Sequence, residues 1–159
     1  MINVKLICTG NLKEAYLKQA YSEYVKRLGG LCKFETIELK EHKLPDDPSD
    51  SEIASALEEE GKRILALLPS RAYKIALCVE GKQFSSEEFA KKIESASLNY
   101  SEICLVIGSS FGLAPSVKSA CDLRLSVSQM TFPHQLMRII LLESVYRAFN
   151  IIKGTKYHK

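Results

Sequence analysis

The sequence predicts an α/β fold, in which a mostly parallel sheet is covered by helices on both faces. Two observations predict it. Strand-like apolar runs alternate with amphipathic, helix-like segments along the whole chain. Most of these runs are continuously apolar, which is typical of parallel strands that helices bury on both sides. The chain has 159 residues, of which 46% are hydrophobic and 26% charged, so we expect one domain over residues 1–159 with a full core.

The first half of the chain predicts two strands and two helices, with strands at 2–8 and 32–39 and helices at 12–28 and 52–68. The second strand alternates apolar and polar residues, and both helices carry apolar residues three and four positions apart. Gly29 and Gly30 end the first helix. The acidic segment 45–51 is rich in turn formers and supplies N-caps to the second helix, which Pro69 ends.

The second half predicts three further strands, at 73–79, 102–107 and 123–127. One helix between them begins at Ser85-Ser86, with Glu87 and Glu88 in its first turn, where acidic side chains stabilise the helix dipole. Another is a short helix at 115–120, which follows a turn of small residues at 108–112. These elements complete the predicted sheet.

A long apolar segment near the C-terminus predicts a last helix that is buried on two sides. Pro133 lies in its first turn, where a missing N–H costs nothing, and Gly154 ends it. The segment is apolar on too many sides to pack on one sheet face alone. Arg138, Glu143 and Arg147 interrupt it, which excludes a membrane span. We expect one side to pack on its own domain and the other on a second copy, forming a homodimer.

The polar side chains of this last helix are predicted to lie on different sides. At 100° per residue, Glu143, Arg147 and Asn150 share one solvent-exposed stripe, while Arg138 lies roughly 140° from Glu143. Arg138 therefore faces the buried side, where an unpaired charge is costly. It either forms a structural salt bridge or contacts an anion or substrate at the interface between subunits.

The composition indicates a protein of the cytoplasm. Five cysteines, an odd number without a CxxC pair, lie mostly in apolar strand-like runs, so we expect reduced core residues rather than disulfides or a metal site. The first ten residues lack the features of a signal peptide. Residues 134–159 carry a net charge of +4, against +3 for the whole chain. This excess suggests a polyanionic partner, and a tail that only aids solubility is the alternative.

Unusual residues follow three of the predicted strands, in the segments 77–81, 107–112 and 127–132. Ligands of such sheets bind at the carboxyl ends of the strands. The run from Gly108 to Gly112 matches G-x-S-x-G, and Asp122 and His134 follow in the order of a serine hydrolase. A hydrolase is therefore an alternative, although the match is short and no earlier loop carries an oxyanion-hole motif. Small residues in this turn would also let backbone groups approach a flat ligand.

Several longer motifs can be compared with those of a known family. They are LSVSQMTFPHQLMR at 125–138, YRAF at 146–149 and YHK at 157–159, together with GNLKE at 10–14 and VIG at 106–108. These motifs closely resemble those of the bacterial ribosomal large-subunit pseudouridine N3-methyltransferases. That family is the minimal member of the SPOUT class of knotted, SAM-dependent methyltransferases. The resemblance covers the whole chain.

The resemblance implies a topology and a cofactor. It implies a C-terminal trefoil knot, in which the chain threads through a loop, and a homodimer formed through the C-terminal helix. It implies that SAM binds at the knot, in contact with Leu77, Gly108, Val127, Ser128, Gln129, Met130, Thr131 and Phe132. Leu77, Met130 and Phe132 would pack on the adenine ring. One departure is Ser109, where the family usually has glycine and where a side chain would crowd the cofactor or face solvent.

The resemblance also implies a substrate and catalytic residues. Members of the family methylate N3 of a pseudouridine in the large-subunit rRNA of the assembled ribosome, without a metal. Arg138 would lie near the junction of cofactor and target, and Tyr157 and His158 would reach the active site, with His158 as base or orienter. The RNA phosphates would be contacted by Lys153, Lys156 and Lys159. The non-enzyme alternative is a dimeric ribosome-binding protein that does not depend on SAM.

Overall fold

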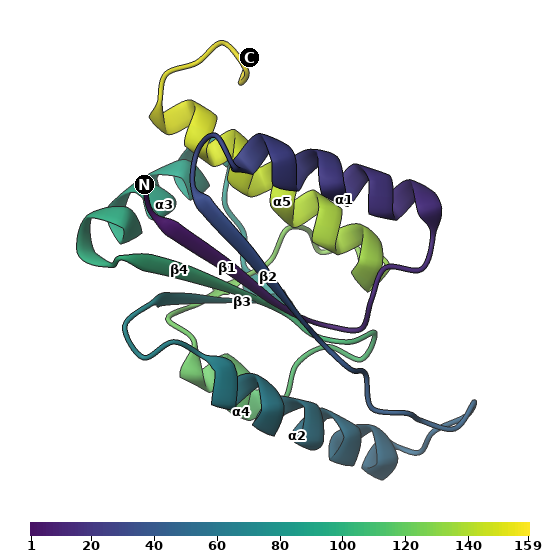
Figure 1. Cartoon of the computed structure of the whole chain (residues 1–159). Coiled ribbons are helices and arrows are strands. Elements are labelled where there is room, and N and C mark those ends of the chain that lie inside the picture. The colour runs from purple at the N-terminus through teal and green to yellow at the C-terminus, as the bar shows by residue number, and fades with distance from the viewer.

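The computed structural model describes residues 1–159 and confirms the predicted α/β fold. Five strands form one parallel sheet in the order β2-β1-β4-β3-β5. The strands are β1 (Asn3–Thr9), β2 (Lys33–Leu39), β3 (Tyr73–Lys82), β4 (Glu102–Ile107) and β5 (Leu123–Leu125). The helices are α1 (Ala15–Leu28), α2 (Asp50–Leu67), α3 (Ser86–Asn99), α4 (Pro115–Ala120) and α5 (His134–Ile152). Helices α1, α3 and α5 cover one face of the sheet, and α2 and α4 cover the other (Figure 1).

Side chains of the central strands alternate between two hydrophobic cores, one on each face of the sheet. Leu6 of β1 lies in the larger core with α1, α3 and α5, whereas Ile7 lies in the core with α2 and α4. Leu105 and Val106 of β4 divide in the same way. Successive strand residues point to opposite faces, so burial of both faces explains why these strands are apolar throughout.

Local polar contacts set the beginnings of the first two helices, which differ from the prediction. α2 begins two residues earlier than predicted, at Asp50, because Ser49 and Glu52 form a capping box. α1 begins three residues later than predicted, because the chain before it is drawn toward α5. There the Lys13 N–H donates to Gln135 Oε1 over 3.0 Å. This contact joins the start of α1 to the start of α5.

The ends of β3 and β5 also differ from the prediction. β3 continues three residues further, to Lys82, and a Cβ on Gly81 would lie only 2.7 Å from the backbone of Arg124 and Leu125 in β5. β5 is two residues shorter, because the chain turns at Ser126, whose hydroxyl donates to the Ser128 carbonyl over 3.0 Å. Gly81 therefore permits β3 and β5 to approach each other closely, just before the polar turn that follows β5.

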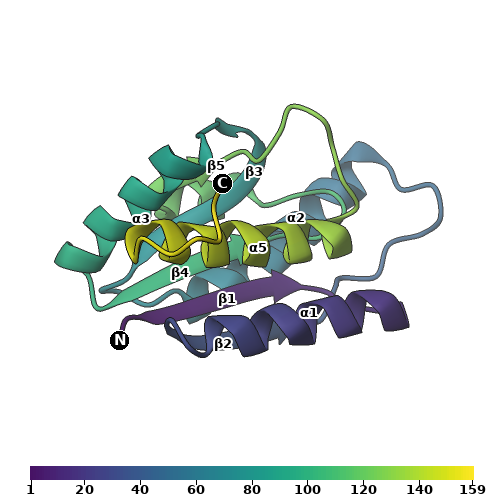
Figure 2. The ribbon, with the colours of Figure 1, turned by 90° about the horizontal axis from the view of Figure 1, so that it is seen from above.

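Helix α5 lies on the sheet between α1 and α3 (Figure 2). The predicted burial of Arg138 is confirmed, since this residue is 2% exposed. The predicted solvent stripe is wrong at Asn150, which is 6% exposed. The chain folds back after α5, so that the Thr155 hydroxyl donates to Asn150 Oδ1 over 2.7 Å, and the Asn150 amide donates to the Tyr146 carbonyl. Helical periodicity placed Asn150 in water because it took no account of this cover.

Other predictions concern chemistry rather than topology. All five cysteines are free, and Cys8, Cys32 and Cys104 are buried. None of the helices is both long and apolar enough to cross a bilayer, and no group of three potential metal-ligating side chains occurs. The trefoil knot and the single-domain assignment stay predictions.

Candidate functional site

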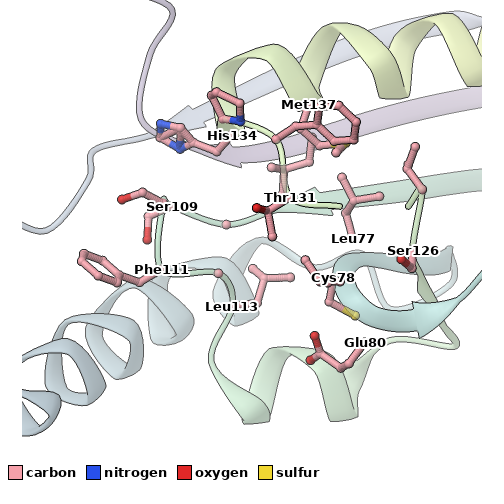
Figure 3. Close-up of a pocket in the computed structure, with 18 of the residues that line it drawn as sticks. Leu77, Cys78, Glu80, Ser109, Phe111, Leu113, Ser126, Thr131, His134 and Met137 are labelled. Carbon is pink, nitrogen blue, oxygen red and sulfur yellow. The ribbon is translucent and has the colours of Figure 1, made fainter. Parts of the chain in front are cut away.

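A pocket opens at the carboxyl ends of β3 and β4, beside the segment that links β5 to α5 (Figure 3). Its cavity has a volume of about 350 Å³, within the range of small-molecule sites. The three segments that follow predicted strands, 77–81, 107–112 and 127–132, all contribute residues to its wall. Ligands of parallel α/β sheets bind at this edge of the sheet, so this pocket is the candidate functional site.

Seven of the eight residues predicted to contact a cofactor line this pocket. They are Leu77, Gly108, Val127, Ser128, Met130, Thr131 and Phe132. Gln129 is exposed and is not part of the wall. Met130 is 71% exposed and Val127 is 37% exposed, so part of the apolar lining has no cover within the chain. Uncovered apolar side chains beside bare backbone suit a ligand with a flat apolar face, such as the adenine of SAM.

The loop between β4 and α4 requires glycine at both of its ends. A Cβ on Gly108 would lie 2.0 Å from the Gly112 carbonyl oxygen, so no side chain fits there. Gly112 has φ of +92°, a left-handed conformation that side chains disfavour. Its N–H donates to the Ser109 carbonyl over 2.9 Å and closes the turn. This wall of the pocket therefore consists largely of backbone that a ligand can approach closely.

The Ser109 side chain is engaged with α2. Its hydroxyl donates to Glu60 Oε1 over 3.1 Å, and both residues are buried. The other carboxylate oxygen of Glu60 accepts the His42 backbone N–H over 3.1 Å. Close packing of α2 on α4 allows this contact, since a Cβ on Gly61 would lie 2.8 Å from that of Ala114. Glu60 thus ties the loop after β4 to the loop after β2.

Four ionisable side chains line the pocket: Cys78, Glu80, Lys118 and His134. Glu80 and Lys118 form an ion pair, whose hydrogen bond lowers the pKa of the Glu80 carboxyl. Burial raises the pKa of the Cys78 thiol. Burial also lowers the pKa of His134, which therefore carries a neutral imidazole near pH 7. The pocket thus holds one internally neutralised ion pair and two uncharged groups.

Arg138 lies behind the pocket wall, one helical turn after His134, and does not line the cavity. Its Nη1 donates to Glu38 Oε2 over 2.7 Å and its Nη2 donates to the Gly10 carbonyl over 3.0 Å. The guanidinium also lies 5.8 Å from the ring centre of Tyr21. Of the two alternatives for this residue, the structure contains the salt bridge. A contact with cofactor or target stays a prediction.

Tyr157 and His158 lie at the opposite end of α5 from the pocket (Figure 1). The Tyr157 hydroxyl donates to Glu143 Oε2 over 2.8 Å. The His158 ring lies 2.8 Å from Glu87 Oε1 and 3.3 Å from Nη1 of Arg147. The tail folds back along α5 as far as Glu143, which lies six residues, about 9 Å at 1.5 Å per residue, after the pocket-lining Met137. Tyr157 and His158 do not line the pocket of their own chain, so a catalytic role for them calls for a second copy.

The position of Asp122 excludes a serine hydrolase. Ser110 and His134 line the pocket, but Asp122 exchanges two hydrogen bonds with the backbone of Lys74, over 2.7 and 2.8 Å. These bonds lie where β3 and β5 begin, at the opposite edge of the sheet. The three side chains therefore cannot form a triad.

The sequence did not identify Glu60 as a residue of the site, and it suggested a role for His134 only as a member of a serine hydrolase triad. A signal for His134 existed, because it lies two residues after the segment predicted to bind the cofactor. Glu60 is the last of three consecutive glutamates on α2, and its partner Ser109 is 49 residues away. No local pattern distinguishes it from its exposed neighbours.

The sequence and the fold of this chain both resemble those of known methyltransferases. The sequence model of one family, described as "Predicted SPOUT methyltransferase", matches residues 2–158. A Streptococcus thermophilus protein named "Ribosomal RNA large subunit methyltransferase H" is 54% identical over 159 residues, which cover 99% of this chain and 100% of that one. A Leuconostoc mesenteroides protein of the same name is 46% identical with the same coverage.

Two solved structures share the fold at low sequence identity. A probable methylase family protein from Haemophilus influenzae has a TM-score of 0.55 and 15% identity, covering 99% of this chain and 70% of that one. A tRNA methyltransferase from Aquifex aeolicus has a TM-score of 0.52 and 14% identity, covering 91% of this chain and 69% of that one. At such identities the likeness concerns the fold alone.

Proposed function

Because this chain belongs to the SPOUT methyltransferase family, we propose that it transfers a methyl group from SAM to N3 of a pseudouridine in large-subunit ribosomal RNA. The name of its 54% identical relative supports ribosomal RNA as the substrate. The motif resemblance described above supports the pseudouridine, its N3 atom and the assembled ribosome. The reaction would take place in the cytoplasm.

The observation that carries this proposal is the pocket at the carboxyl ends of β3 and β4. Leu77, Met130 and Phe132 line it and would pack on the adenine of SAM, while the bare backbone beside Gly108 would bond the ring nitrogens. Bound SAM supplies a methyl group that its sulfonium makes electrophilic. The residues that line the pocket would hold this methyl group and exclude water, so that the target nitrogen could be oriented toward it.

The outer side of α5 would form a homodimer. Leu136, Ile140 and Ile151 lie within about 60° of one another around the helix axis, and all three are at least partly exposed. Uncovered apolar side chains on a helix that is already buried on its other side favour a second protein surface. A second copy of the same helix offers a matching apolar surface in a two-fold interface.

The tail of one copy would serve the pocket of the other. Antiparallel pairing of two α5 helices brings the end of one helix close to the beginning of its partner. Tyr157 and His158 would then orient the target base there, with Arg138 supporting the wall behind it. The RNA phosphates would be bound by the exposed residues Lys153, Lys156 and Lys159.

The test uses ribosomes from cells that lack this modification, incubated with the purified protein and methyl-labelled SAM. Label on N3 of a pseudouridine is expected, and Gly108→Val should abolish it because the pocket has no room for a side chain at that position. Gly30→Val is the matched control, since Gly30 is exposed outside the pocket and a Cβ there would meet no atom closer than 3.8 Å. No label on ribosomes, subunits or naked rRNA would overturn the proposal. A SAM titration would then separate another methyltransferase from a ribosome-binding protein.

A further inference from the structure

The pocket contains one ionisable side chain that no partner within the chain engages. His134 is the first residue of α5, is half-buried and lines the cavity (Figure 3). Its ring takes part in none of the side-chain hydrogen bonds of the protein, whereas the ring of His158 contacts both Glu87 and Arg147. His134 thus presents a free imidazole to whatever fills the pocket.

The other ionisable groups of the pocket are unsuited to accept a proton. The Glu80 carboxylate is paired with Lys118, and that pairing stabilises its charged, unprotonated form. The Cys78 thiol is kept protonated because burial raises its pKa. Only the imidazole of His134 combines a free nitrogen lone pair with a neutral resting state.

Charged groups from four segments of the chain surround His134, and their effects on its pKa oppose one another. Burial is the largest cause of its lowered pKa. Arg138 on α5 and Lys13 before α1 lower that pKa further, while Glu41 after β2 and Glu60 on α2 raise it. The start of a helix also disfavours a cation. Burial and the cations outweigh the two carboxylates, so the ring rests neutral yet has anionic groups near enough to stabilise a proton once it arrives.

We propose that His134 is a catalytic residue, which accepts the proton that leaves the target nitrogen during methyl transfer; this inference rests on the proposed function. The electron pair of the N3–H bond forms the new N–C bond with the methyl group. The C–S bond breaks and its electron pair stays with sulfur, which loses its positive charge. The proton passes to the free ring nitrogen of His134 and from there to water.

The experiment compares wild type, His134→Asn and His134→Ala in single-turnover methyl transfer to unmodified ribosomes between pH 5.5 and 9.5. The wild-type rate should rise with pH through a pKa below the ordinary histidine value of about 6.5 and then level off. Both variants should be slowed by about 100-fold at pH 7 and should lack this plateau. Their rates should keep rising toward alkaline pH, where the target nitrogen loses its proton unaided. Added imidazole should partly restore His134→Ala.

Binding and folding give readouts that do not depend on turnover. Calorimetric SAM affinity and the thermal unfolding midpoint should stay near wild type in both variants, and NMR of the wild type should show the His134 ring titrating below the ordinary histidine pKa of about 6.5. His42→Asn is the matched control, because its ring is exposed outside the pocket, and it should retain full activity.

Three outcomes would overturn the inference. One is a variant with the wild-type rate and pH profile. Another is a variant whose rate loss is matched by lost SAM affinity, which would make His134 a cofactor contact. The third is the absence of rescue by imidazole together with an unchanged pH dependence. If the wild-type protein itself transfers no label, the proposed function fails before this inference is tested.

Discussion

The two ends of α5 each carry an arginine paired with a glutamate, but the surroundings of the two pairs differ. Near the pocket, Arg138 pairs over 2.7 Å with Glu38 of β2, and its side chain is 3% exposed. Near the tail, Arg147 pairs over 2.6 Å with Glu143 on the same helix, and its side chain is 30% exposed. The first pair joins residues 100 positions apart, and the second joins neighbours one turn apart.

The pair at Arg138 therefore stabilises the fold behind the pocket, whereas the pair at Arg147 holds the C-terminal tail. Arg138 holds β2, the Gly10 carbonyl and α5 together behind the pocket, with its own side chain buried although that of Glu38 is 47% exposed. Glu143 and Arg147 form a partly exposed surface on which Tyr157 rests, with its ring centre 4.8 Å from the guanidinium. Water can replace those contacts, so little stability would be lost if, in the proposed dimer, the tail left its own chain for the partner's pocket.

The largest effect is expected from deleting residues 155–159, which would break the proposed exchange of tails. Methyl transfer should fall about a thousandfold, the order that positioning and proton-transfer groups contribute. SAM affinity should change little, because the tail does not line its own pocket, and the thermal midpoint should fall only slightly, because the contacts of Thr155 and Tyr157 that are lost are partly exposed. Labelled methyl transfer and calorimetry measure activity and SAM affinity, with Lys62→Ala, at an exposed position of α2, as a control that keeps the tail. A shortened protein as active as the full chain would remove the tail from the mechanism.

The next effect concerns the pocket end, where Glu38→Ala would leave Arg138 buried without its charged partner. The free energy of unfolding should fall by about 2.5 kcal/mol in urea denaturation, below the range for a fully buried pair, because Arg138 is buried but the side chain of Glu38 is 47% exposed. Glu35→Ala is the matched control, because Glu35 lies on the same strand with a largely exposed side chain and a longer contact, 3.7 Å, to Lys5. Equal changes in the two variants would mean that burial does not distinguish these pairs.

A smaller effect is expected from Ser109→Ala, which removes a buried hydrogen bond to the Glu60 carboxylate. The free energy of unfolding should fall by about 2 kcal/mol, the range for a bond to a charged group, and SAM should bind more weakly because the loop that forms one wall loses its tie to α2. Ser110→Ala removes the same group from the exposed neighbouring position and should leave the free energy of unfolding unchanged. Unaltered SAM binding in Ser109→Ala would separate this tie from the pocket.

The smallest effect on stability is expected from Glu143→Gln at the tail end. The change weakens the pair with Arg147 and the bond from Tyr157, both partly exposed, so unfolding should shift by about 1 kcal/mol or less. Residues 155–159 should nevertheless become more mobile, as shown by lower NMR order parameters. An ordered tail in this variant would mean that other contacts, such as that between His158 and Glu87, suffice to hold it.

The fold was largely predictable because its signals are local. β4 and α4 have the predicted bounds, since an apolar run ends at Gly108 and Pro115 begins the helix. The position of the pocket was predictable too, because parallel strands bring their carboxyl ends to one edge. The contacts of Arg138 and Glu60 were not, since periodicity indicates that a side chain is buried but not against what. Asn150 was misplaced because the chain folds back over it directly after α5, which helical periodicity does not indicate.

The five free cysteines give the protein an intrinsic chemical reporter. Burial raises the pKa of the Cys104 thiol to about 12 and that of Cys8 and Cys32 to about 11, so their reactive thiolates are scarce and inaccessible near neutral pH. Cys78 is half-buried and lines the pocket, while Cys121 is half-buried outside it. Alkylation of Cys78, followed by mass spectrometry and compared with the same reaction without ligand, would slow when a ligand fills the cavity. The unlabelled, unmutated chain can thus report its own occupancy.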